Sequence, residues 1–224
     1  SSDERITQTV MKPLKTKDIV SSVRGEQLRD KNFSRIKFTG NEAKQIRELV
    51  SKEQTMLAIG LDASIPTITN PSLAQFGIIH IASHSLLDVK TPELSAVVLS
   101  LVNENGEDTP GFLTAKQIYS LNLPVNLVVL SACETGLGKD LKGEGIVGLT
   151  RAFMYAGAAR VIVSLWKVDD KATSELMVRF YKYLLKEHIT PSQALQKAQL
   201  SMRNDPAWKL PYYWAGFVIQ GEYK

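Results

Sequence analysis

Cysteine is almost absent from this sequence: its 224 residues hold only one, Cys133. A single cysteine cannot form an internal disulfide, which excludes a disulfide-stapled fold and fits a reducing compartment or a thiol kept for its reactivity. No apolar run approaches the ~20 residues that span a bilayer, and the N-terminus carries no apolar signal core. We therefore expect a cytoplasmic protein that does not contact a membrane.

An excess of charge of one sign is also absent from most of the chain. Residues 1–54 hold 12 Lys and Arg against 8 Asp and Glu, whereas residues 55–224 hold 15 of each class. The first part mixes both signs and offers only Phe33 and Phe38 as aromatics, so it lacks the basic stripe with interleaved aromatics of a nucleic-acid binder. We expect no direct contact with nucleic acid.

The composition is that of a globular domain, with 44% hydrophobic and 22% charged residues. Residues 1–34 show no strong period and predict a loose leader or a junction to a missing N-terminal region. Residues 35–224 are long enough for one large domain. Here apolar strand segments alternate with amphipathic helical ones, and several strands are apolar on both faces. This pattern predicts an α/β fold with a mostly parallel sheet between helical layers.

Periodicity, caps and turn residues define the expected elements. Thr114 and Thr190 are expected to cap helices at their N-termini, and Gly157 is expected to end one. Expected strands cover residues 34–38, 55–61, 77–83, 95–102, 125–131, 160–166 and 213–219. Expected helices cover residues 41–52, 113–121, 145–155, 169–187 and 190–202.

Two of the expected strands lead into residues that can do chemistry, namely His84 and Cys133. Because ligands bind beyond the carboxyl ends of parallel strands, we expect both side chains at one edge of the sheet. An imidazole beside a thiol raises the thiolate fraction and later protonates the leaving group, which is the minimal equipment of a cysteine hydrolase. The alternative for Cys133 is a buried small hydrophobe.

The remaining histidines carry less chemical signal. His80 and His84 point to the same face of a strand, but His80 lies inside the apolar run and is expected to be a core or supporting histidine. A metal site on this pair would need a third ligand at metal spacing, and none accompanies them, so we expect no metal. His188 lies between two expected helices and is expected at the surface.

Several longer motifs follow one another in a fixed order. They are HIASH at residues 80–84, LSACETGLG at 130–138, GEG at 143–145, LTRAF at 149–153, AGA at 156–158, SLWKVDD at 164–170 and YYWAGF at 212–217. Over about residues 35–222 this set resembles the CHAT domain, a caspase-like peptidase family often found in bacteria. His84 precedes Cys133 by 49 residues, similar to the step of about 50 in caspases. This order disfavours amidotransferases and α/β-hydrolases, in which the nucleophile comes first.

The resemblance implies a fold and a set of roles. The fold is a caspase-like three-layer α/β/α sandwich with a mostly parallel sheet of about six strands. Cys133 would be the nucleophile and His84 the general acid and base, while the backbone N–H groups of Ser85 and Cys133 would hold the oxyanion. The family normally has glycine at the position of Ser85, and a positive φ there would be costlier for serine.

The implied function is a cysteine endopeptidase that cleaves protein or peptide substrates without a cofactor, under the control of a partner or of N-terminal repeats. One alternative is a non-catalytic caspase-like scaffold or protein-interaction module with an unformed dyad. Another is a small-molecule amidase or transferase that uses the same dyad.

Two further features bear on specificity and control. Asp169 and Asp170 follow a strand next to the nucleophile strand and could form an acidic pocket for a basic residue of the substrate; the alternative is that they cap the following helix. The loop at residues 136–145 corresponds in position to the caspase activation loop and is a place for gating or self-cleavage, or else a solvated surface loop.

Overall fold

The computed structural model describes residues 36–88, 90–131 and 144–222. Its main sheet contains β1 (Ile78–Ile81), β5 (Leu127–Leu130), β6 (Arg160–Ser164) and β7 (Phe217–Gly221) in that spatial order. The first three strands run parallel, and β7 is antiparallel to β6 at the edge. The predicted α/β class with a mostly parallel sheet is confirmed. Within the described residues this sheet has four strands, not the expected six or so.

A second, antiparallel sheet accounts for the other described strands. It consists of β2 (Ser85–Leu86), β3 (Ala96–Val98) and β4 (Phe112–Thr114), with β3 in the middle. The sequence predicts β3 as part of a longer strand but not its two partners. Strands of two and three residues are too short to show the alternation that identifies a strand in a sequence.

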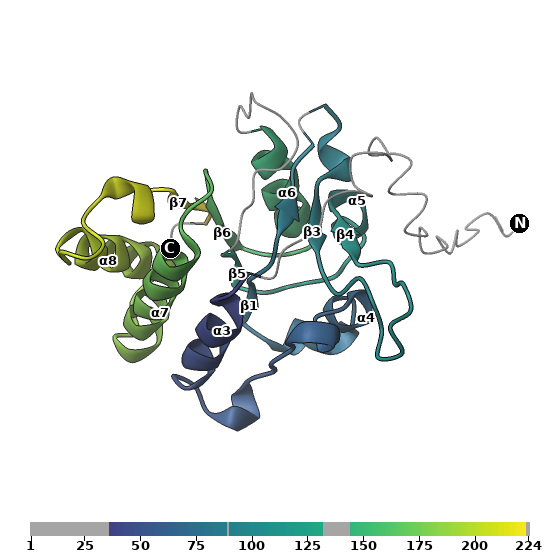
Figure 1. Cartoon of the computed structure of the whole chain (residues 1–224), viewed down its shortest axis with the longest axis horizontal. Coiled ribbons are helices and arrows are strands. Elements are labelled where there is room, and N and C mark those ends of the chain that lie inside the picture. Colours follow the sequence, from purple (N-terminus) through teal and green to yellow (C-terminus); the bar gives the residue numbers. More distant parts are fainter. Residues whose placement is uncertain (1–35, 89, 132–143, 223–224) are drawn as a thin grey trace, which may run out of the picture.

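Helices cover both faces of the main sheet (Figure 1). One face carries α5 (Ala115–Ile118) and α6 (Glu144–Tyr155), together with the second sheet. The other face carries α3 (Thr39–Arg47), α7 (Asp170–Lys186) and α8 (Pro191–Arg203).

The central strand β5 shows how the two faces share the core. Its side chains alternate between the faces, and all four are buried. Val128 and Leu130 pack toward α6, whereas Leu127 and Val129 pack toward α7 and α8. A strand buried on both sides reads as a continuous apolar run, which is why the sequence identifies it clearly.

Short elements make up the rest, and here the sequence predictions fail more often. They are η1 (Lys52–Gln54), η2 (Gly60–Asp62), α4 (Ile65–Ile68), η3 (Pro71–Gln75), η4 (Pro92–Leu94) and η5 (Pro211–Tyr213). The strand expected at residues 55–61 is wrong: Gly60 has a φ of 65° and begins η2. The residues of this segment are half-buried or exposed, and none of the described strands pairs with them. Of the strand expected at 34–38, residues 36–38 are not a strand, and the rest lies outside the described residues.

Helix boundaries are predicted best where a side chain caps the helix. Thr114 and Thr190 both cap helices, as predicted, and each forms a capping box, with Gln117 and Gln193 respectively. Gly157 follows α6 with a φ of 115°, which confirms it as the end of that helix. The helix expected at residues 41–52 instead covers Thr39–Arg47, and its N-cap residue, Phe38, has no capping side chain to mark the start. None of the described helices is long and apolar enough to cross a membrane.

Candidate functional site

His84 lies where the main sheet passes into the second sheet. It comes three residues after β1, directly before β2, and its carbonyl accepts the Val98 N–H at 2.8 Å. The neighbouring strand β5 is paired with β1 up to its last residue, and the Ser131 N–H donates to the Ile81 carbonyl at 3.0 Å. Cys133, two residues after Ser131, lies outside the described residues, so the dyad stays a prediction.

Ser85, the residue expected to donate a backbone N–H to the oxyanion, is a strand residue with 2% of its surface exposed. In an antiparallel ladder, hydrogen-bonded pairs alternate with pairs that are not hydrogen-bonded. Because His84 and Val98 share a hydrogen bond, Ser85 and Val97 form the next, non-bonded pair, and the Ser85 N–H points away from β3. Among the described non-glycine residues only His188 has a positive φ, so the anticipated cost of serine does not arise.

His80 belongs to a buried polar cluster between β1, α3 and α7. Its Nε2 lies 2.7 Å from Glu42 Oε1, and its Nδ1 lies 3.1 Å from the Tyr181 hydroxyl. The Glu42 side chain is completely buried. Burial raises the pKa of Tyr181, and the negative charge of Glu42 adds to this effect, so the phenol stays protonated. The prediction of a core or supporting histidine is confirmed.

Glu42 and Tyr181 are partners of His80 that were not predicted from the sequence. Glu42 lies in an amphipathic segment where an acidic residue is normally solvated, and Tyr181 fits the apolar face of a long helix. Only a contact between α3 and α7 brings both to His80, and no local pattern encodes that contact.

The two aspartates predicted as a substrate pocket have structural roles at the start of α7. Asp169 Oδ1 accepts the Ala172 N–H at 2.9 Å, which confirms the alternative that it caps this helix. Asp170 Oδ2 accepts the Phe38 N–H at 3.0 Å and so ties α3 to α7. Burial raises the pKa of Asp170, with a further contribution from the charge of Glu42, while the Phe38 N–H opposes the rise. The acidic pocket itself stays a prediction.

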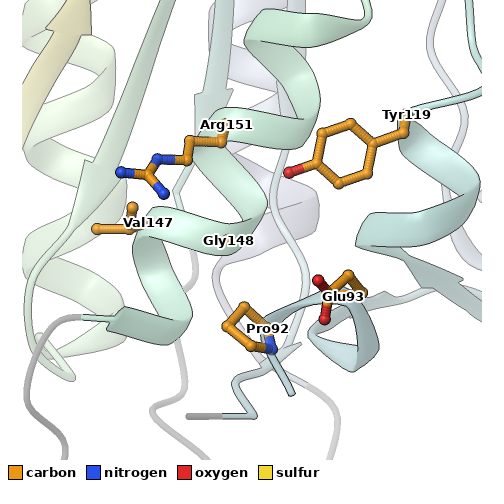
Figure 2. Close-up of a pocket in the computed structure, with 6 residues that line it drawn as sticks. All are labelled: Pro92, Glu93, Tyr119, Val147, Gly148 and Arg151. Carbon is orange, nitrogen blue, oxygen red and sulfur yellow. The ribbon is translucent and has the colours of Figure 1, made fainter. Parts of the chain in front are cut away.

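A cavity of about 460 Å³ opens between η4, α5 and α6 (Figure 2). Pro92 and Glu93 come from η4, Tyr119 follows α5, and Val147 and Arg151 come from α6. Gly148 also lines it; a Cβ atom at that position would lie 2.9 Å from Pro92 Cβ, so glycine allows α6 to pack closely on η4. Three separate segments build this cavity, so no local sequence pattern predicts it.

Metal ligands are not grouped in the described part of the chain. No set of three or more His, Cys, Asp or Glu side chains there could hold an ion. His80 is instead engaged by a carboxylate and a phenol.

Comparison with known proteins identifies similar sequences in two mammals. Tetratricopeptide repeat protein 28 of Homo sapiens is 39% identical over 109 residues, and its Mus musculus counterpart is 38% identical over the same length. Each match covers 49% of this chain but only 4% of the relative, so the chain spans a small part of these proteins. The family model of the CHAT domain matches residues 2–222, which is nearly the whole chain. The chain therefore belongs to the CHAT domain family.

Proposed function

We propose that this CHAT domain is a protein-interaction module built on a caspase-like α/β scaffold. The observation that carries the proposal is the outer face of α6. Leu149 and Phe153 are buried on the inner face, yet Met154 and Tyr155 on the outer face expose 38% and 76% of their surfaces. An exposed helix normally turns a polar face to water, and clustered exposed apolar residues mark interaction sites.

The relatives support the same conclusion. Both are named for tetratricopeptide repeats, which are stacked helix pairs that form extended concave binding surfaces. A domain that shares sequence with proteins of this kind fits a role in protein assembly.

A photo-crosslinking amino acid placed at Tyr155 tests the interaction module. We expect a discrete adduct with a partner protein in lysate of the source cells, and the same adduct when Cys133→Ala or His84→Ala is present, because neither side chain is needed for binding. The matched control places the probe at Leu200, a 45% exposed residue of α8 on the opposite face of the sheet. The proposal would be contradicted if the probe gave the same adduct in equal yield at both positions, or if Cys133→Ala abolished the adduct.

A second function, a cysteine endopeptidase, has its own structural support. The pairing of β1 with β5 brings the chain that leads to Cys133 beside the chain that leads to His84, and the Ser85 N–H points away from its partner strand. In this reaction the Cys133 thiolate attacks the scissile carbonyl, and the developing oxyanion accepts backbone N–H groups. His84 then protonates the leaving amine, and water hydrolyses the thioester to release the acid and the free thiol.

Alkylation by iodoacetamide tests the endopeptidase without a known substrate, since every signal comes from one thiol. A thiolate activated by His84 would react rapidly below neutral pH and slow down in His84→Ala. The matched control is His188→Asn, which changes an exposed histidine with a positive φ that asparagine tolerates. If the alkylation rate shows the pH dependence of an ordinary thiol in all three proteins, an assembled dyad is excluded and the interaction module is the remaining function.

A further inference from the structure

We propose that the cavity between η4, α5 and α6 anchors the partner, and that it receives an acidic side chain from an amphipathic helix of that partner. This inference rests on the proposed interaction module and specifies its binding site. It concerns the α6 face, by which we mean Val147, Arg151, Met154 and Tyr155 together with Tyr119.

The polar groups of the cavity are not used within the protein. Across residues 36–88, 90–131 and 144–222, no hydrogen bond or ion pair engages the side chains of Arg151, Glu93 or Tyr119. Arg179 on α7 is the opposite case, since its guanidinium binds both Glu175 and Asp205. A guanidinium offers five donors in a fixed plane that matches a carboxylate. Arg151 therefore has no partner among the described residues, and its exposed guanidinium can bind a carboxylate.

The α6 face has the composition of the centre of an interface. Val147, Arg151, Met154 and Tyr155 stand at i, i+4, i+7 and i+8, which places them on one side of the helix. The Tyr119 and Tyr155 rings meet edge to face, with centroids 5.3 Å apart and planes at 74°. Tyrosine, methionine and arginine are enriched at interface cores, and rings already fixed by each other lose little freedom on binding.

The spacing of the residues along α6 favours a helix as the occupant. The cavity lies between η4 and Tyr119 on one side and α6 on the other, and Figure 2 shows the Tyr119 hydroxyl pointing toward α6. Apolar residues flank Arg151 along α6 over about two turns. A helix bound in a groove uses anchors at i, i+3 or i+4, and i+7, which matches this length.

The two charged residues of the cavity, Arg151 and Glu93, define which charged and polar side chains the bound helix carries. Arg151 attracts a carboxylate, and a carboxylate bound bidentately by a guanidinium is among the stronger charged contacts. Glu93 lies on η4 across from α6, so it repels a second acidic residue and accepts an N–H from a basic or amide side chain. The partner helix therefore carries an acidic residue among apolar ones, with a donor on the side that faces η4.

A display library of amphipathic helical peptides, randomised on one face and selected on the whole chain, tests this proposal. We expect the enriched peptides to carry one Asp or Glu flanked by aliphatic or aromatic residues. The consensus peptide, measured by fluorescence polarisation, should bind Arg151→Glu at least tenfold more weakly. A peptide with its acid replaced by Lys should recover affinity for Arg151→Glu, because the charge pair is restored with reversed signs.

The matched control is Arg203→Glu, which reverses an exposed arginine in the last turn of α8 and should leave affinity unchanged. Enriched peptides without an acidic preference, or equal affinity for Arg151→Glu and the parent, would overturn the anchor. Self-association of the chain that Arg151→Glu abolishes would also overturn it, since a second copy would then be the occupant. If crosslinking at Tyr155 succeeds while Arg151→Glu leaves the peptide affinity unchanged, the interaction module is supported and only the role of Arg151 as an anchor is refuted.

Discussion

Replacing Glu42 with alanine should release helix α3 from the sheet. The substitution removes a completely buried carboxylate and leaves His80 Nε2 without its partner at 2.7 Å. A hydrogen bond to a charged group contributes about 1.5–3 kcal/mol, and the His80 side chain is 13% exposed, so water replaces part of the lost bond. We expect the free energy of unfolding to fall by about 2 kcal/mol, or the Tm by about 4–8 °C in a domain of this size.

Urea unfolding and hydrogen exchange measure the two consequences of Glu42→Ala. Amides of α3 should exchange faster, because the second tie of this helix, from the Phe38 N–H to Asp170, does not hold it alone. Amides of α6, on the other face of the sheet, should keep their rates. Glu48→Ala is the control, since this residue is exposed and ends the same helix. If the two variants are equally stable, Glu42 does not hold α3 in place.

Three further predictions concern the charges of α7 and the end of α6. The folded state raises the pKa of Asp170, so the stability that this group contributes is present at acidic pH and is lost as the pH rises through the pKa of the folded state. In thermal melts, the Tm of Asp170→Asn should therefore equal that of the parent at pH 3 and exceed it at pH 7. The Arg179 guanidinium holds the pKa of Asp205 below its usual range, so Asp205→Asn should lose stability at neutral pH, and the gap to the parent should close in acid. Gly157→Ala should lower the free energy of unfolding by more than about 1 kcal/mol in urea titrations, because φ is 115° and the new Cβ would lie 3.0 Å from the Leu123 carbonyl oxygen.

Local signals made the main elements predictable. The strands β5 and β6 are buried on both faces, so their apolar runs identify them without any knowledge of the fold. Thr114 and Thr190 mark helix starts because a capping box is a property of four consecutive residues. The placement of His84 after the carboxyl end of β1 follows from the same reasoning about parallel strands.

Contacts between distant segments explain what the sequence did not predict. The strands β2 and β4 exist because β3 pairs with both, and neither is long enough to be recognised alone. Glu42 has the sequence context of a solvated acid and becomes buried only when α3 packs on α7. The segment at residues 55–61 is apolar enough for a strand, but a strand needs a neighbour for its backbone hydrogen bonds.

The two faces of the main sheet differ in how they use their polar side chains. On the α7 face, His80, Asp169, Asp170 and Arg179 each have a hydrogen-bond partner within the protein. These hydrogen bonds hold the helices in fixed positions, although Glu42 Oε2 in the same cluster is buried without a hydrogen-bond partner in the described part of the chain. On the α6 face, no described residue forms a hydrogen bond or ion pair with the Arg151 side chain, and Tyr155 is exposed. Since binding energy comes from groups that gain partners in the complex, the proposed interaction module would bind its partner through the α6 face.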